Sequence, residues 1–159
     1  MTKRIIPYLW FEKDGEEAAN FYVSLFKDGE VHEVSTYENG GPDGKSPFRT
    51  ITFRLRNIEY AILEAGPMFK FNESVSFLIQ CEDQAEVDYF WNGFINNGGE
   101  ESVCGWLKDK YGLSWQVVPN RLDELINDPD KAAADRVMQA MLQMVKIDVA
   151  ALEAAYRGE

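Results

Sequence analysis

The chain holds few of the side chains that usually carry covalent or acid–base chemistry. It has one histidine, His32, and two cysteines, Cys81 and Cys104, among 159 residues. The cysteines lie in strand-like runs and form no CxxC pair, so we expect buried free thiols in a reducing compartment. A lone histidine excludes most Ser-His and Cys-His nucleophile arrangements. The residue types therefore favour ligand binding over nucleophilic catalysis.

In three strand-like segments, the residues at every second position combine polar and apolar side chains, and residues spaced in this way share one face of a β-strand. The residues on these faces that we expect to line a ligand pocket are Tyr60, Ile62, Glu64, Ser76, Leu78, Ser114 and Gln116. The opposite faces, which include Phe77 and Trp115, are apolar enough to pack beneath helices. Apolar walls with a few orienting polar groups are typical of small-molecule sites. The alternative is a solvated sheet face.

The segments that would position these residues form two similar halves, residues 4–66 and 74–119. Each half begins with a β-rich run, passes through an acidic turn into an amphipathic helix, and ends in antiparallel strands. The two helices have a similar pattern of acidic and aromatic residues, EEAANFYVSLF in the first and QAEVDYFWNGF in the second. We interpret the halves as a divergent duplication of a βαβββ module within a single α+β domain, 1–159. An ordinary α+β alternation is the alternative.

Capping and turn residues predict where these elements begin and end. Asp14 and Asp83 are the expected N-caps of the two module helices. In the first half, a tight turn at Asn57-Ile58 is expected to join two strands. In the second half, the charged loop 108–112 is expected to close a hairpin, with its charged side chains in solvent.

Residues 120–159 are expected to form a helical tail. A short helix at 122–126 precedes a long helix that Asp128 would cap and that would continue to Asp148. Asp148 would in turn cap a last helix. The methionines of the long helix suit packing in the core or on a partner subunit, and a binding role for them is the alternative.

Charge and hydropathy limit the expected partners and location. The net charge is −11 and the pI is about 4.6, so nucleic acid and anionic membrane surfaces are not expected partners. No apolar run approaches the roughly 20 residues of a membrane span. The N-terminus meets the charged residues 12–14 too early for a signal peptide. We therefore expect a cytoplasmic protein.

Four stretches carry a family resemblance across nearly the whole chain. They are PYLWF with EEAANFYVSLF, GPMFKFNESVSFLIQCEDQAEVD, GWLKDKYGLSWQVVP and ADRVMQAMLQMVKIDVAALEAA. They resemble PhnB-like proteins of the glyoxalase/bleomycin-resistance/dioxygenase group, also called vicinal oxygen chelate proteins. Many of these carry the name 3-demethylubiquinone-9 3-methyltransferase. The resemblance implies two βαβββ modules of this type, each curling a sheet around a cavity, and a homodimer.

The resemblance also implies positions for a metal site. In metal-using relatives, four inward side chains from the first and last strands of the two modules bind one divalent ion. The corresponding residues are Pro7, Glu64, Ser76 and Gln116. Of these, only Glu64 and Gln116 offer suitable ligand atoms, and a stable site needs three or more. We expect no cofactor, or at most a divalent metal that Glu64 and Gln116 hold together with water or substrate.

The methyltransferase name can be compared with the residues. A typical S-adenosylmethionine enzyme has a doubly wound sheet and a Gly-rich loop after its first strand. Here the first strand is followed by EKDGEEAANFY, which contains a single glycine. The sequence thus favours a small-molecule-binding protein with an incomplete metal site. The alternatives are a metal-dependent enzyme of the superfamily and an interaction protein that acts through its C-terminal helix.

Overall fold

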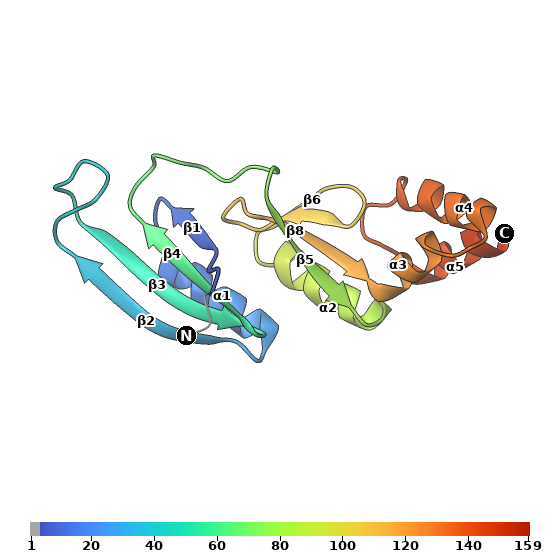
Figure 1. Ribbon diagram of the computed structural model, residues 1–159, viewed down its shortest axis with the longest axis horizontal. Helices are drawn as coiled ribbons and strands as arrows, with labels where there is room; N and C mark the ends of the chain where they lie inside the picture. Colours follow the sequence, from blue (N-terminus) through green and yellow to red (C-terminus); the bar gives the residue numbers. More distant parts are fainter. Residues whose placement is uncertain (1–3) are drawn as a thin grey trace. The chain divides into compact units, whose positions relative to one another are not determined.

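The computed structural model describes residues 4–159 as two compact units, unit 1 ending at Phe71 and unit 2 spanning Asn72–Glu159 (Figure 1). The elements of unit 1 are β1 (Tyr8–Phe11), α1 (Gly15–Phe26), β2 (Glu30–Tyr37), β3 (Phe48–Leu55) and β4 (Ile58–Glu64). The elements of unit 2 are β5 (Ser76–Cys81), α2 (Gln84–Ile95), β6 (Glu100–Glu101), β7 (Trp106–Lys108), β8 (Ser114–Pro119), α3 (Asn120–Ile126), α4 (Lys131–Met141) and α5 (Val149–Arg157). Among the helices within residues 4–159, none combines the length and hydrophobicity of a membrane span.

The two sheets have equivalent topology. The strand orders are β1-β4-β3-β2 and β5-β8-β7-β6. In each sheet the first strand of the unit pairs in parallel with the last, and the remaining pairs are antiparallel. The predicted α+β class, with two βαβββ modules followed by C-terminal helices, is therefore confirmed.

In unit 1, α1 lies against one face of the sheet (Figure 1). Tyr22 of α1 stacks on Phe53 of β3, and Phe53 stacks on Tyr60 of β4. These three rings are almost fully buried and form the centre of the unit 1 core. Asp14 does precede the helix, but it has a φ of 63° and its side chain makes no capping hydrogen bond. Asp14 therefore occupies the predicted N-cap position, but its side chain does not supply the cap.

The tight turn between β3 and β4 also differs from the prediction. Leu55 pairs with Ile58, so the turn residues are Arg56 and Asn57 rather than Asn57 and Ile58. Arg56 takes the positive φ, 53°, that a two-residue hairpin requires. The predicted position was one residue too late because neither candidate pair contains the glycine that usually marks such turns.

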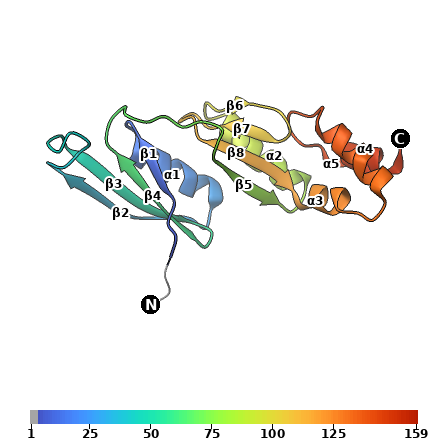
Figure 2. The same ribbon diagram turned by 45° about the horizontal axis from the view of Figure 1, so that its top comes forward.

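In unit 2, α2 covers the face of the sheet that carries Trp115 (Figure 2). Asp83 caps this helix as predicted, because its carboxylate accepts a hydrogen bond from Glu86 N at 2.9 Å. The Trp115 ring packs against Phe94 of α2 and against Phe77 of β5. The apolar strand face expected to lie beneath a helix does so.

The charged loop that follows β7 is not simply solvated. Asp109 is only 3% exposed, and its carboxylate accepts hydrogen bonds from Tyr111 N, Leu113 N and Trp115 Nε1 at 2.9 to 3.0 Å. The loop is therefore built around a buried carboxylate. The prediction of a solvent-facing turn is wrong for Asp109, whereas Lys110 is exposed as expected.

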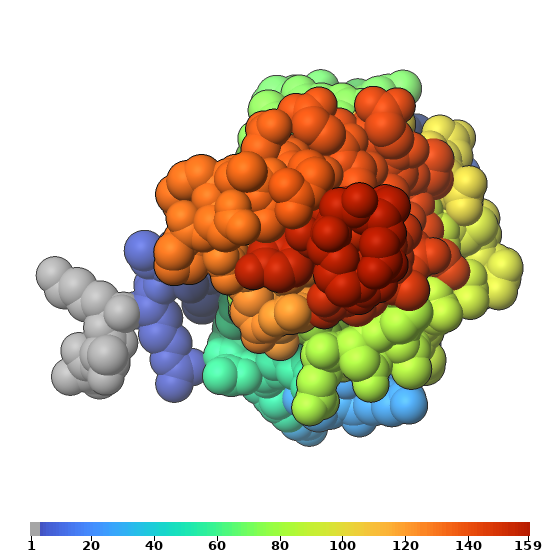
Figure 3. Space-filling view, turned by 90° about the vertical axis from the view of Figure 1, so that its right-hand side faces the viewer, coloured from blue at the N-terminus to red at the C-terminus, as the bar shows by residue number. Residues whose placement is uncertain are grey.

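The C-terminal helices (orange and red in Figure 3) pack together around a hydrophobic core of their own. The buried residues of this core are Val118, Leu122, Leu125, Val137, Ile147 and Leu152. Met141 and Met144 pack against it, in agreement with the core-packing interpretation of the methionines. Asp148 caps α5 as predicted, but α4 is capped by Asp130 rather than by Asp128.

The long helix predicted to reach Asp148 ends at Met141. After it, the backbone carbonyls of Met144 and Val145 accept hydrogen bonds from the N–H groups of Cys104 and Gly105, both at 2.8 Å. These carbonyls could not serve the segment before β7 if the helix continued, because helical carbonyls bond within the helix. The tail therefore fixes the start of β7 through its backbone.

An ion pair also joins the tail to α2, and it makes stability depend on pH. Hydrogen bonds from Lys146 Nζ and Gln84 Nε2 to the Asp88 carboxylate lower its pKa below the ordinary value of 3.8. Its contribution should be complete above about pH 4 and lost as the pH falls through the lowered pKa. Because the pair is partly exposed, the contribution is small. The difference between the urea midpoints of wild type and Asp88→Asn should be full at about pH 6 and should shrink as the pH falls below the ordinary pKa of 3.8. A difference that does not shrink on acidification would contradict this.

Candidate functional site

The predicted pocket residues of unit 2 lie on the face of its sheet opposite α2, which we call the outer face. Trp115 points toward α2, so its strand neighbours Ser114 and Gln116 point the other way. The register places Ser76 beside Ser114, and Leu78 beside Gln116. The sheet thus brings together all four of the residues that alternation assigned to one face of unit 2.

The polar groups of this face are only partly satisfied. Gln116 Nε2 donates a hydrogen bond to Ser76 Oγ at 2.9 Å. Ser114 is 1% exposed, and its hydroxyl oxygen has no hydrogen-bond partner within residues 4–159. A buried hydroxyl without a partner costs free energy, so such a group in a folded protein calls for a ligand, a water or a functional role. Ser114 is the most informative residue of the outer face.

Two further residues of β7 share this face and were not predicted as site residues. Trp106 pairs with Gln116 across the strands, and Lys108 pairs with Ser114. Leu107, between them, is buried on the α2 side. The alternation of Trp106 and Lys108 around Leu107 is the signal in the sequence that could have revealed them, but a run of three residues indicates only one arm of a hairpin.

Lys108 already has an anionic partner. Its Nζ lies 2.5 Å from a carboxylate oxygen of Glu73, which precedes β5. This hydrogen bond raises the pKa of Lys108 and lowers the pKa of Glu73. At neutral pH both groups are therefore charged, although both are partly exposed. The outer face of unit 2 thus combines three neutral polar residues with a lysine held by a neighbouring glutamate.

In unit 1 the predicted pocket face is the wrong one. Tyr60, Ile62 and Glu64 do share a face, but that face is covered by α1. Tyr60 stacks in the core, Ile62 is fully buried, and both Ile62 and Glu64 lie against Gly15 at the start of the helix. These three residues cannot line a pocket on the outer face of the unit 1 sheet.

Glu64 serves the helix rather than a ligand site. Its Oε2 accepts a hydrogen bond from Gly15 N at 2.7 Å, which provides the N-terminal cap that Asp14 does not supply. Its other oxygen lies 3.4 Å from Arg49 Nη1, and Arg49 also pairs with Glu16. The side chain of Glu64 is 15% exposed, at the edge of a shallow hollow beside α1. Both of its carboxylate oxygens are engaged within unit 1.

The residues present do not fit the divalent-metal site that the fold implies. Pro7 has no ligand atom, Glu64 faces α1, and Ser76 and Gln116 are bonded to each other. Within residues 4–159, no group of three or more His, Cys, Asp and Glu side chains is placed to hold a metal ion. The lone histidine, His32, instead pairs with Glu59 at 3.1 Å.

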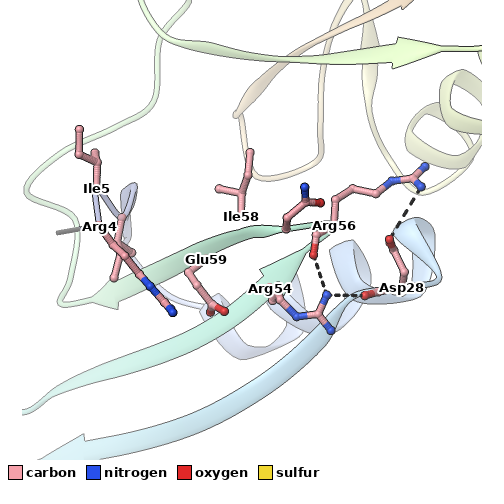
Figure 4. Close-up of a pocket in the computed structure, with 9 residues that line it drawn as sticks. Arg4, Ile5, Asp28, Arg54, Arg56, Ile58 and Glu59 are labelled. Carbon is pink, nitrogen blue, oxygen red and sulfur yellow. Dashed lines mark hydrogen bonds and ion pairs between the residues drawn. The ribbon is translucent and has the colours of Figure 1, made fainter. Parts of the chain in front are cut away.

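A groove at one end of unit 1 includes none of the predicted site residues. It lies between the N-terminal segment at Arg4 and the β3–β4 turn (Figure 4). The guanidinium of Arg54 donates to the backbone carbonyls of Asp28 and Arg56 at 3.1 and 2.6 Å, as the dashed lines in Figure 4 show. Arg56 pairs with the Asp28 carboxylate at 3.8 Å. Arg54 and Arg56 therefore join the end of α1 to the turn, which is a structural role.

Replacing Glu64 separates the capping role from a metal role. Glu64→Ala should lower the free energy of unfolding by about 1–2 kcal/mol, because it leaves Gly15 N–H and part of Arg49 without an acceptor. The metal content of the purified protein, measured by mass spectrometry, should not change. A stoichiometric ion that is lost in Glu64→Ala or in Gln116→Ala would contradict the capping assignment and restore the metal hypothesis.

Comparison with known proteins identifies the fold and the family. The family model described as 3-demethylubiquinone-9 3-methyltransferase matches residues 3–118. A structure of the PhnB protein from Bacillus cereus, which carries the same methyltransferase name, is 32% identical with a TM-score of 0.63 and covers 74% of this chain and 99% of that one. A search of curated proteins gave no match.

More distant structures are similar in fold alone. The fosfomycin resistance protein FosX from Mesorhizobium loti is 14% identical with a TM-score of 0.54, and FosX from Listeria monocytogenes, solved with Mn(II) and sulfate, is 18% identical with a TM-score of 0.51. Each comparison covers 74% of this chain and 91% of the FosX chain. The chain belongs to the PhnB-like, 3-demethylubiquinone-9 3-methyltransferase family, and its fold is similar to that of the FosX structures.

Proposed function

We propose that the protein binds a small molecule on the outer face of the unit 2 sheet, without a complete metal site. The observation that carries this proposal is the buried Ser114 hydroxyl, which has no partner within residues 4–159 and lies beside Gln116 and Ser76. Leu78, 51% exposed, and Trp106 add apolar surface to the same face. Few polar groups among apolar walls are the usual composition of a small-molecule site.

The alternative function is a metal-dependent enzyme, and the distant FosX structures are the reason to consider it. One of them was solved with Mn(II) and sulfate. The ligand atoms in this chain that could serve such an ion are fewer than a stable site needs, and Glu64 is engaged with α1. Binding is therefore the better supported function. The methyltransferase name gains no support from the fold, because a four-stranded βαβββ sheet has no Gly-rich cofactor loop after its first strand.

A compound screen by thermal unfolding tests the binding proposal. Compounds that bind the native protein should raise the melting temperature of wild type by mass action. Gln116→Leu should abolish the shift, because it removes the carboxamide from the centre of the outer face. Gln139→Leu is the matched control, since Gln139 lies exposed on α4 and should leave the shift intact. A set of hits that stabilises Gln116→Leu as much as wild type would disprove the proposal.

We also propose a homodimer. Each unit exposes large apolar side chains outside the proposed ligand site: Tyr8, Met68 and Phe69 in unit 1, and Val75 and Val103 in unit 2. Exposed apolar surface of this kind often marks an interface. Sedimentation velocity should give about twice the monomer mass of 18.2 kDa. A protein that sediments as a monomer at micromolar concentration would disprove the dimer.

The cytoplasm is the proposed location. Cys81 and Cys104 are both free thiols in the structure. A reducing compartment maintains cysteines in this state. Fractionation of cells that express the protein should recover it with the cytoplasmic proteins.

A further inference from the structure

Ser114 and its three polar neighbours on the outer face make a group of four hydrogen-bond donors. In the register of the sheet, Ser114 lies between Ser76 on β5 and Lys108 on β7, and Gln116 is two residues along the same face. The group comprises two hydroxyls, one carboxamide and one ammonium. Adjacent strands hold such side chains about 5 Å apart, close enough to converge on one small group. Donors of this kind, with one positive charge, suit an oxygen anion.

The ammonium of Lys108 is at present occupied by a carboxylate from the same chain. Glu73 belongs to a turn before β5, and its side chain is 63% exposed. An ion pair between exposed groups is weak, so a competing anion can replace Glu73 at little cost. Glu100, opposite Lys108 on the edge strand β6, adds a further negative charge near the ammonium. A ligand anion must therefore compensate for these charges by also bonding the hydroxyls and the carboxamide.

In the row of side chains next to Ser114, an apolar residue lies on each side of Gln116. Leu78, Gln116 and Trp106 are neighbours across β5, β8 and β7, and they share the outer face with Ser114. A ligand anchored at Ser114 would thus lie with its remaining atoms over a leucine and an indole. This surface favours a flat or aliphatic apolar body rather than a second charge.

We propose that the outer face of unit 2 binds a small apolar carboxylic acid, whose carboxylate displaces Glu73 from Lys108 and accepts a hydrogen bond from Ser114 Oγ. Glu73 holds the place of the ligand carboxylate when no ligand is bound. The inference rests on the proposed function, and it specifies the chemical class of the ligand. It also explains why a serine hydroxyl is buried without a partner within residues 4–159.

Benzoate, with benzamide as its neutral isostere, is the probe for this site. Binding to the full chain is measured by NMR titration of the Trp106 indole N–H. Benzoate should bind wild type and benzamide should not. Glu73→Gln should bind benzoate about threefold more tightly, because it removes the competing carboxylate. Lys108→Met should weaken binding by about tenfold and Ser114→Ala by about threefold.

The gain in Glu73→Gln is the decisive result, because a misfolded variant cannot bind more tightly. Glu82→Gln is the matched control: it removes one negative charge from an exposed position of unit 2 and should leave the affinity at the wild-type value. Equal affinities of Glu73→Gln and wild type, or equal binding of benzamide and benzoate, would overturn the inference. If neutral compounds still depend on Gln116 in that case, the proposed function stands and only the ligand class is wrong.

Discussion

Asp109→Ala is expected to lower the free energy of unfolding of unit 2 by about 3 kcal/mol, because three N–H groups lose one buried acceptor. Two of these donors, Leu113 N and Trp115 Nε1, belong to buried residues that water cannot reach without local opening. Hydrogen bonds to a charged acceptor are roughly twice as strong as neutral ones, which increases the loss. Urea unfolding followed by tryptophan fluorescence measures the change.

Asp43→Ala is the matched control for this substitution. Asp43 also accepts three hydrogen bonds, from Lys45 N, Ser46 N and Ser46 Oγ, but it lies in an exposed loop. Water can replace the lost acceptor there, so the change should be far smaller. Similar losses in the two variants would show that the burial of Asp109 is not the source of its contribution.

Ile147→Ala is expected to destabilise unit 2 by a similar amount, about 3 kcal/mol, because it leaves a cavity in the core of the C-terminal helices. Ile147 is fully buried, and its side chain packs against Gly105 at the start of β7. The cavity should also loosen the backbone bonds from Cys104 to the tail. The Cys104 thiol of Ile147→Ala should therefore react faster with a disulfide reagent than that of wild type.

Leu142→Ala tests whether this effect is specific to the core. Leu142 is in the same tail but is 48% exposed, so its truncation leaves no cavity. Neither the unfolding midpoint nor the thiol reactivity should change appreciably. If Ile147→Ala behaves like Leu142→Ala, the tail does not hold the start of β7 in place.

Much of the architecture could be predicted because its signals are local. The apolar stripes of α1 and α2 and the capping residues Asp83 and Asp148 are set by neighbours in the sequence, and these predictions are confirmed. The face of β8 was also predicted correctly. There, Trp115 and Val117 are clearly more apolar than Ser114 and Gln116, so only one face could meet a helix.

The face of β4 could not be decided in the same way. Its two candidate faces, one with Ile62 and Glu64 and one with Ala61 and Leu63, are both largely apolar. The carboxylate of Glu64 suggested the outer face, but it is the charge that α1 needs at its N-terminus. The alternation of residues along β4 predicts which side chains share a face. It does not predict which of the two faces α1 covers.

Other features depend on contacts between distant segments and have no local signal. The helix α4 ends at Met141 because Cys104 and Gly105 use the carbonyls that follow it. Asp109 is buried together with Trp115, whose indole N–H donates a hydrogen bond to its carboxylate. Charged residues in a glycine-containing loop are usually exposed to solvent, and the sequence does not show that a tryptophan side chain contacts one of them. The sequence alone therefore favoured a solvent-exposed loop.

The parallel pairing of the first and last strand in each unit has a consequence for synthesis on the ribosome. When β1 emerges it has no partner, and the strand it bonds to, β4, is the last of its unit to be made. The same holds for β5 and β8. Neither sheet can close until its last strand, β4 or β8, has been translated, so each sheet should acquire protection against proteases in one step rather than strand by strand.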